Sequence, residues 1–393
     1  MKVISRTVWV LSLVSFFTDI SSEMLYPVMP LYLKSIGFSV VLIGVLEGFA
    51  EATAGLSKGY FGKLSDVQGK RLPFVQLGYA LSAISKPMMA VLTWPWWIFS
   101  ARTIDRLGKG VRTGARDALL AGEAPGRSRG EVFGFHRTMD TFGAALGPTL
   151  ALVFLYLNPG SYHMLFYLAF IPGVAGVLGT LAIKEKKINI VRKKAVSFFS
   201  FIRYLPTSSA AYKKLLSGLL VFTLFNSSDV FLLLMLKHHG ISDTMLIGMY
   251  IFYNLIFAVF AYPLGKVADN IGLKKMFIAG LAFFSIVYFG MAYFKDQEMF
   301  FVLFFLYGVY AACTEGVSKA WISNTCKKED MATAIGTYEA FRSIATLLAS
   351  SLAGLIWFYV SPKATFITTA VAVSLLIIYF INIEEVHSSA DHT

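Results

Sequence analysis

The chain has little charge and almost no cysteine. Charged residues make up 15% of its 393 positions, whereas hydrophobic residues make up 56% and phenylalanine alone occurs 35 times. A soluble domain of this length needs more polar surface, so the composition excludes an ordinary soluble protein. The two cysteines are Cys313 and Cys326, and Cys326 falls at the end of a hydrophobic stretch, so we expect no disulfide.

The sequence also lacks the motifs of ATP-hydrolysing proteins and of zinc enzymes. It contains no phosphate-binding glycine loop and no His-Glu-x-x-His zinc motif. The first hydrophobic stretch is too long for a cleaved signal peptide and has no small-residue cleavage site. We therefore expect neither an enzyme nor a cofactor, and we expect an ion gradient to supply any energy that the protein needs.

Long hydrophobic stretches dominate what is present. A membrane-spanning helix needs about 20 such residues, and stretches of that length recur along the whole chain. They predict an all-α membrane protein with twelve spans, near residues 8–33, 40–61, 73–93, 95–119, 131–157, 163–183, 214–237, 244–264, 275–294, 299–323, 332–358 and 363–383.

A charged loop occurs twice. The segment Gly62–Arg71 returns 203 positions later as Gly265–Lys275. Duplicated halves around a central site are typical of secondary transporters. The repeat predicts two pseudo-symmetric six-helix bundles, at residues 1–183 and 214–383. A basic amphipathic linker at residues 184–213 is expected to join them, and residues 384–393 are expected to form a short cytoplasmic tail.

The basic residues cluster on one side of the predicted membrane. With the amino terminus placed in the cytoplasm, 24 of the 35 Lys and Arg residues fall in cytoplasmic segments and four near outer loops. This bias predicts cytoplasmic termini in a multi-pass cell-membrane protein, with a bacterial inner membrane as the expected location. It also explains the net charge of +12 without a nucleic-acid partner. In the linker, Phe198–Leu205 is expected to lie on the inner leaflet.

The repeated loop resembles the best-known motif of the major facilitator superfamily, and the likeness covers essentially the whole chain. In that family the loop latches a cytoplasmic gate, and its aspartate faces a helix amino terminus. Val67 and Asn270 replace the arginine that usually follows this aspartate, which implies a simpler latch. The matching residues are Gly62, Asp66, Gly69, Lys70, Arg71, Gly265, Asp269 and Gly272.

Two further motifs support the resemblance. The fifth predicted span, residues 131–157, has small residues and a proline in a pattern similar to that of the antiporter branch, which includes bacterial drug:proton antiporters. Ala151 and Leu152 depart from this pattern. Small residues permit close helix contact, and proline bends a helix. The pattern comprises Gly134, Gly143, Gly147 and Pro148. Helix four resembles the intramembrane arginine motif through Arg102, Asp105 and Arg106, where Arg106 replaces a common glycine and needs a partner.

Ionisable residues inside predicted spans are costly, so they mark proton relays, substrate contacts or ion pairs. Several lie four apart and therefore share a helix face. The candidates for proton coupling or substrate contact in the first half are Asp19, Glu23, Glu47, Glu51, Arg102, Asp105, Arg106, His136 and Asp140. The alternative is that the acids only neutralise nearby basic side chains.

The second half is expected to shape the substrate pocket. Its candidates are Asn226, Asp229, Glu315, Lys319, Glu339 and Arg342, and the close spacing of the last four also predicts ion pairs within one helix. Aromatic residues such as Tyr250 and Tyr253 are candidates for the lining.

The leading hypothesis is a monomeric secondary active transporter that exports a small molecule in exchange for protons. A carrier of an anionic metabolite or carboxylate siderophore remains open, because Arg102, Arg106 and Lys319 could clamp anionic oxygens. Acids without basic partners favour protons and cations, whereas unpaired arginines favour anions. Weaker alternatives are a divalent-metal exporter that uses His136 and Asp140, and a membrane receptor that transports nothing.

Overall fold

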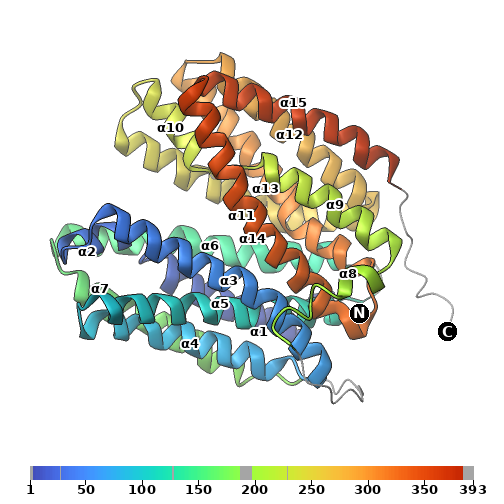
Figure 1. Cartoon of the computed structure of the whole chain (residues 1–393), viewed down its shortest axis with the longest axis horizontal. Coiled ribbons are helices and arrows are strands. Elements are labelled where there is room, and N and C mark those ends of the chain that lie inside the picture. Colours follow the sequence, from blue (N-terminus) through green and yellow to red (C-terminus); the bar gives the residue numbers. More distant parts are fainter. Residues whose placement is uncertain (1–2, 27, 126–127, 186–196, 228, 384–393) are drawn as a thin grey trace. The chain divides into compact units, whose positions relative to one another are not determined.

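The computed structural model describes residues 3–26, 28–125, 128–185, 197–227 and 229–383, and these residues form helices and connecting turns without a β-strand. Figure 1 shows the helices, which in chain order are α1 (Arg6–Glu23), α2 (Met29–Ser35), α3 (Val40–Gln68), α4 (Leu72–Val91), α5 (Pro95–Glu123), α6 (Arg129–Leu157), α7 (Tyr162–Thr180), α8 (Tyr204–Thr207), α9 (Ala210–Phe225), α10 (Val230–His238), α11 (Asp243–Ile271), α12 (Leu273–Tyr293), α13 (Gln297–Asn324), α14 (Met331–Tyr359) and α15 (Pro362–Asn382).

Each of the twelve predicted spans corresponds to one long helix or to a pair of shorter helices. The first predicted span is divided between α1 and α2, and the seventh is divided between α9 and α10. A proline in the first turn helps to start α2, because its fixed backbone angle suits that position. Both breaks occur at corresponding places in the two halves, so the duplication includes an interruption that the sequence analysis did not predict.

Serine side chains start many of the helices. Ser5, Ser39, Ser209, Ser242 and Ser361 each accept a hydrogen bond from the backbone N–H three residues later. A serine at this position satisfies a donor that the first turn leaves without a partner, which fixes the start of the helix.

The chain divides into two compact units. Unit 1 contains Met1–Ala124, Met139–Thr207 and Lys327–Ala340, and unit 2 contains Pro125–Thr138, Ser208–Cys326 and Phe341–Thr393. In unit 1, α4 packs on α5 and α7, and in unit 2, α12 packs on α13 and α15. The first turns of α6 belong to unit 2 and those of α14 to unit 1, which the predicted bundle boundaries did not anticipate. The linker residues 186–196 and the tail lie outside the described residues.

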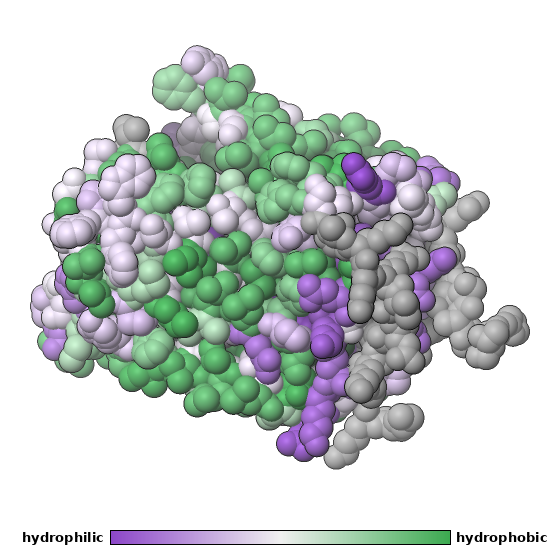
Figure 2. Space-filling view, turned by 60° about the horizontal axis from the view of Figure 1, so that its bottom comes forward, coloured by the Kyte–Doolittle hydropathy of each residue, from purple (hydrophilic) through white to green (hydrophobic). Residues whose placement is uncertain are grey.

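Many long helices present hydrophobic side chains outward, as expected for lipid contact. Within the described residues, eight helical segments are long and apolar enough to cross a membrane, beginning at Arg129, Tyr162, Ala210, Gly248, Leu273, Gln297, Lys328 and Pro362. Helix α14 exposes Leu347, Leu352 and Phe358, among others. Hydrophobic residues likewise cover much of the face in Figure 2. The predicted spans that contain α1, α3, α4 and α5 are not among these eight and stay predictions.

Three glycines bring helices of unit 1 into backbone contact. Gly62 on α3, Gly114 on α5 and Gly336 on α14 lie together. A side-chain carbon on Gly62 would collide with the carbonyl of Ala332, and one on Gly336 would collide with the carbonyl of Lys58. The absent side chains therefore set the distance between these helices.

Unit 2 repeats this arrangement with Gly265 on α11, Gly316 on α13 and Gly134 on α6. A side-chain carbon on Gly134 would lie 2.5 Å from the carbonyl oxygen of Ala261 and 3.2 Å from the Cα of Gly265. Gly265 is the repeat equivalent of Gly62, so the duplicated loop motif begins at a helix crossing in both units.

The loop glycines have a separate role. Gly69 ends α3 with φ at 64°, and Gly272 links α11 to α12 with φ at 101°. These are backbone angles that favour glycine, so both turns depend on it.

The predicted amphipathic linker segment is only partly on the surface. Phe201 is 2% exposed and packs against Gly59 of α3, whereas Phe198 and Phe199 are exposed. The segment is therefore anchored to unit 1 through Phe201, and its contact with the inner leaflet stays a prediction.

Replacing Gly62 with Ala should destabilise the protein by about 1–3 kcal/mol, the usual cost of overpacking. The added carbon would meet the Ala332 carbonyl and force α3 away from α14. Thermal unfolding of the purified protein in detergent measures the effect. Gly48→Ala, on the same helix but with open space around the new carbon, should leave the melting temperature unchanged or slightly higher. Equal melting temperatures for both variants would contradict this explanation.

Candidate functional site

Charged side chains join α3 to α5 at two levels, one helical turn apart. Glu47 accepts hydrogen bonds from Arg102 Nε at 2.8 Å and from its Nη2 at 2.9 Å. Arg106 Nη1 lies 3.2 Å from Glu51 Oε1. Residues four apart share a helix face, so two acids and two arginines meet as matched pairs. Glu51 is thus the partner that the sequence analysis required for Arg106.

Asp105 lies beside these pairs and joins α5 to α4. Its Oδ1 accepts a hydrogen bond from Lys86 Nζ at 2.6 Å, and its Oδ2 lies 3.3 Å from Arg102 Nη1. Lys86 is 1% exposed and Asp105 is 5% exposed. Because an unpaired buried charge is costly, these contacts support a structural role for Asp105.

Asp19 on α1 and Asp140 on α6 differ from the other acids. Their carboxyl groups lie close enough to interact with each other. Two ionised carboxylates at close range repel each other, so one proton shared between them would stabilise this contact. Ser15 Oγ donates to Asp140 Oδ1 at 2.7 Å and accepts from Arg116 Nη1 at 3.2 Å. A chain of hydrogen bonds therefore leads from Arg116 through Ser15 to the carboxyl pair.

The glycine motif of the fifth predicted span lies in α6, and two of its glycines bring Asp140 close to Asp19. A side-chain carbon on Gly143 would lie 2.5 Å from the Phe16 carbonyl oxygen and 3.2 Å from the Asp19 Cβ. Gly147 similarly approaches the backbone of Ile20 and Met24, and Pro148 follows within α6. The motif thus allows α6 to contact α1 where the carboxyl pair forms. Gly134 instead contacts α11 in unit 2.

Glu23 is the last residue of α1 and forms no ion pair with any described residue. The charges that act on it most strongly are those of Lys109, Arg106, Asp140 and Arg102. It lies at the break between α1 and α2, so a carboxylate ends the first half of an interrupted helix. This position suits the predicted role of Glu23 but does not assign it.

Two arginines of the later turns of α5, Arg112 and Arg116, are buried. Arg112 is 4% exposed, donates to Ser82 Oγ at 2.8 Å and lies over the Tyr79 ring at 4.5 Å. Arg116 is 8% exposed and pairs with Asp117 at 2.9 Å. These partners come from α4 and α5, and helical spacing alone did not identify them.

The loop motif of the first half contacts a helix amino terminus. Asp66 Oδ2 accepts hydrogen bonds from the Thr333 backbone N at 2.7 Å and from the Thr333 hydroxyl at 2.8 Å, in the first turn of α14. Asp66 Oδ1 accepts from Arg71 Nη2 at 3.1 Å. Burial raises the pKa of Asp66 to about 6, so at pH 7 the carboxylate is mostly ionised and pairs with Arg71. Lys70 is exposed.

Asp269 makes the equivalent contact in unit 2. Its two oxygens accept hydrogen bonds from the backbone N of Gly130 and of Glu131, both at 2.7 Å, in the first turn of α6. Both aspartates thus bind helix amino termini, where the backbone dipole favours an anion. The contacts fit the latch that the family resemblance implies, and the gating role itself stays a prediction.

Ion pairs in the second half join different helices. Glu315 on α13 pairs with Arg342 on α14 at 2.6 Å and with Arg137 on α6 at 2.9 Å. Lys319 lies buried one turn after Glu315. The prediction of pairing within one helix therefore missed the principal partners of Glu315, because spacing along a helix says nothing about its neighbours.

Glu339 was predicted to belong to the pocket of the second half, but it lies in unit 1. Its Oε2 is 3.0 Å from Lys58 Nζ on α3, close to the crossing of Gly62 and Gly336. Lys58 was overlooked as a partner because it was counted only as a cytoplasmic charge. Lys58 lies one helical turn before Gly62 and shares its helix face, and this spacing could have indicated the contact.

Asn226 and Asp229 flank the break between α9 and α10. Asn226 donates to the Tyr310 hydroxyl at 2.9 Å, and Asp229 accepts from the Tyr307 hydroxyl at 2.6 Å. The tyrosines of α13 were overlooked because aromatic residues are frequent throughout this chain. Their spacing of three on one helix would have placed them on a common face.

The structure gives the divalent-metal hypothesis no support. His136 is buried one turn before Asp140, but no group of three His, Cys, Asp or Glu side chains among the described residues lies close enough to hold a metal ion.

The chain also contains one match to the Gly-x-Ser-x-Gly nucleophile pattern, at residues 55–59. Ser57 lies inside the continuous helix α3 rather than on a strand-to-helix turn, so this match is not a nucleophile elbow.

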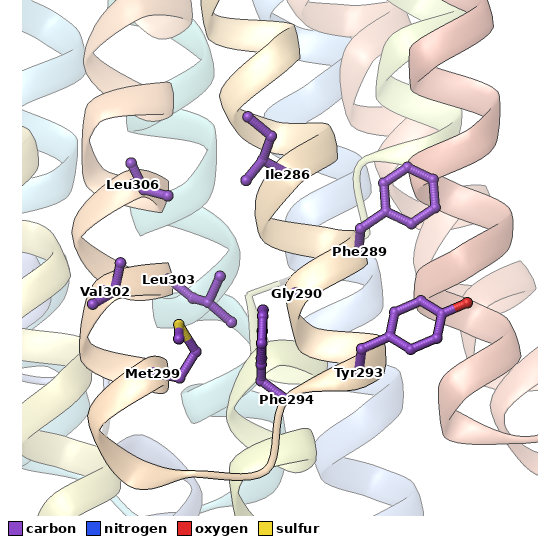
Figure 3. A pocket seen from close by; sticks show the side chains of 9 residues that line it. All are labelled: Ile286, Phe289, Gly290, Tyr293, Phe294, Met299, Val302, Leu303 and Leu306. Carbon is purple, nitrogen blue, oxygen red and sulfur yellow. The ribbon is translucent and has the colours of Figure 1, made fainter.

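A hollow of about 510 Å³ lies between α12 and α13 of unit 2. Figure 3 shows its lining, which includes Phe289, Phe294, Met299 and Leu303. The residues are apolar except for the Tyr293 hydroxyl and none carries a charge, so the hollow has no group that would recognise a polar substrate. We do not assign the transport site to it.

Asp66→Asn should accelerate hydrogen exchange of the Thr333 amide by about tenfold or more. Hydrogen bonds to charged groups contribute about 1.5–3 kcal/mol, and the variant also leaves Arg71 without its anion. Hydrogen exchange with mass spectrometry measures the change. Asp269→Asn is the matched control and should accelerate exchange at Gly130 and Glu131 but not at Thr333. Unchanged exchange at Thr333 in Asp66→Asn would refute the contact.

Comparison with known proteins agrees with the sequence motifs and the fold. The sequence profile of the Major Facilitator Superfamily matches residues 11–252 and 215–392. The uncharacterized MFS-type transporter MJ1317 of Methanocaldococcus jannaschii is 33% identical over 389 residues, which cover 96% of this chain and 95% of that protein. The multi-drug resistance efflux pump PmrA homolog of Lactococcus lactis is 23% identical, covering 93% and 92%.

A solved structure shows the same architecture. The crystal structure of the human organic anion transporter MFSD10 matches with a TM-score of 0.80 at 17% identity, covering 95% of this chain and 99% of that chain. At that identity the match supports the fold alone. The profile match, the 33% identical relative and the shared fold together establish that this chain belongs to the Major Facilitator Superfamily of membrane transporters.

Proposed function

We propose that this transporter is a proton-coupled antiporter that exports a small molecule by alternating access. The observation that carries the proposal is the closeness of two acids, Asp19 and Asp140, where α6 contacts α1 through Gly143, because a shared proton would stabilise such a pair. Ionisable groups inside membrane helices commonly serve as proton relays. A pair that binds a proton in one arrangement and releases it in another is a suitable coupling element.

The contact between α1 and α6 links the proton to conformation. Gly143 allows the two helices to approach, and the approach brings Asp140 close to Asp19. Separating the helices would separate the two carboxyl groups and weaken proton binding. By thermodynamic linkage, proton release would in turn favour separation. Ser15 and Arg116 extend the network toward α5, and Glu23 is the nearest further acid on α1.

Export is favoured over import by two likenesses. The Lactococcus lactis relative is named as an efflux pump, and the glycine pattern of α6 is similar to that of the antiporter branch. The Lys and Arg distribution supports cytoplasmic termini in a cell membrane. Under this proposal the proton gradient supplies the energy, a monomer suffices, and the Asp66 and Asp269 contacts close the cytoplasmic gate. Neither enzymatic activity nor a cofactor is required.

An anionic substrate is the second candidate, because the similar human structure is that of an organic anion transporter. Two of the side chains expected to clamp an anion, Arg102 and Arg106, are already neutralised in this structure. Arg102 pairs with Glu47 and Asp105, and Arg106 pairs with Glu51. An anion would have to displace these carboxylates, so the geometry favours proton exchange over anion capture.

Asp19→Asn and Asp140→Asn should each abolish transport driven by a pH gradient and preserve substrate exchange at equal pH. Each substitution removes one carboxyl group of the pair and with it the shared proton site. Uptake into proteoliposomes, with lipophilic cations and small polycarboxylates compared side by side, measures both activities. Glu23→Gln tests in the same assay whether the neighbouring acid also carries a proton.

Asp296→Asn serves as the control, because Asp296 is exposed and precedes α13. It should transport like the unmodified protein. Gradient-driven transport that survives in both carboxyl-pair variants would refute the coupling role. Loss of gradient-driven transport together with loss of exchange would make the pair a structural or binding element instead. Gradient-driven movement of polycarboxylates alone would favour the anion carrier.

A further inference from the structure

Asp229 lies at the break in the seventh predicted span. Helix α9 ends at Phe225, and Asp229 immediately precedes Val230, the first residue of α10. Its Oδ1 accepts a hydrogen bond from the Tyr307 hydroxyl at 2.6 Å, and its Oδ2 accepts a longer one from the Tyr253 hydroxyl at 3.4 Å. The carboxylate is therefore held by two phenols from α13 and α11.

No basic side chain pairs with Asp229 among the described residues. The charge that acts on it is that of Glu315, which is also negative and already pairs with Arg342 and Arg137. This differs from unit 1, where Glu47, Glu51 and Asp105 each pair with a basic group. Charged groups within membrane proteins usually have an opposite charge nearby, so Asp229 lacks the partner that the other acids have.

Aromatic rings surround this carboxylate. The ring centroids of Tyr253 and Tyr307 are 5.0 Å apart, those of Tyr307 and Tyr310 are 5.2 Å apart, and those of Tyr250 and Tyr253 are 6.0 Å apart. Tyr307 and Tyr310 are each 3% exposed, whereas Asp229 and Tyr250 remain partly exposed. Tyr253 is 8% exposed, so a ligand would reach this group from the side of Asp229 and Tyr250.

The chemistry of this group matches an organic cation. The face of an aromatic ring attracts a positive charge, and the attraction strengthens where water is excluded. The tyrosine hydroxyls orient Asp229 and leave its other lone pairs available. A divalent ion instead prefers several oxygen ligands at close range, and one carboxylate with two phenols provides few.

We propose that Asp229, with the rings of Tyr253 and Tyr307, binds the positively charged centre of an organic cation that the protein transports. This rests on the proposed function, in which the first half carries the proton, and it assigns the recognition of substrate charge to the second half. A substrate cation at Asp229 supplies the opposite charge that this carboxylate lacks.

The test is equilibrium binding of tetraphenylphosphonium to the purified full-length protein in detergent at constant pH. Asp229→Asn should weaken binding at least about tenfold, and Asp229→Glu, which keeps the charge, should restore most of the affinity. Tyr253→Phe keeps the ring and should bind within a few-fold of the unmodified protein, whereas Tyr253→Leu should bind much more weakly. Asp296→Asn removes an exposed carboxylate of the same unit and should not change binding.

Several outcomes would overturn the proposal. They are undetectable binding to the unmodified protein, equal affinity in Asp229→Asn, and equal weakening in Asp229→Glu and Asp229→Asn when both variants have normal melting temperatures. Equal weakening in Tyr253→Phe and Tyr253→Leu would refute the ring-face contact. Because the assay uses no gradient, it is independent of proton coupling. A protein that binds the cation but fails gradient-driven transport would keep this proposal and lose the proposed antiport.

Discussion

The cost of burying charge in a membrane protein constrains the rest of this structure. Every strongly charged helix must bring its side chains to a partner on another helix, and small residues make the approach possible. In unit 1 this constraint pairs Arg102 with Glu47 and Arg106 with Glu51, while Gly62, Gly114 and Gly336 set the helix spacing nearby. The exception to opposite-charge pairing is informative. Asp19 lies close to Asp140, and a proton shared between the two acids would relieve their mutual repulsion.

The two units share the same backbone features but differ in the side chains at the helix break. Both units have a crossing of three glycines, a loop aspartate that accepts hydrogen bonds from a helix amino terminus, and a broken first helix. At the break, however, unit 1 has Glu23 with basic groups acting on it, and unit 2 has Asp229 bound by tyrosine hydroxyls. A transporter that exchanges protons for a cation needs two acidic sites with different preferences, and this divergence is consistent with that need.

The sequence predicted the parts of the structure that depend on local pattern. Twelve hydrophobic stretches, the repeated loop and the family resemblance were enough for the helices and the fold. Glu51 as the partner of Arg106, and Tyr307 as the donor to Asp229, were not predictable in the same way, because they depend on which helix faces which. Arg112 and Arg116 illustrate the same limit. Neighbouring helices bury both side chains, which their position along the span does not reveal.

The central claim is that Asp19 and Asp140 share one proton. Infrared difference spectroscopy of the purified protein at neutral pH tests it most directly, because a protonated carboxyl group absorbs separately from a carboxylate. The account predicts one protonated carboxyl signal that disappears in both Asp19→Asn and Asp140→Asn and persists in Asp296→Asn. A spectrum in which neither carboxyl-pair variant loses such a signal would contradict it.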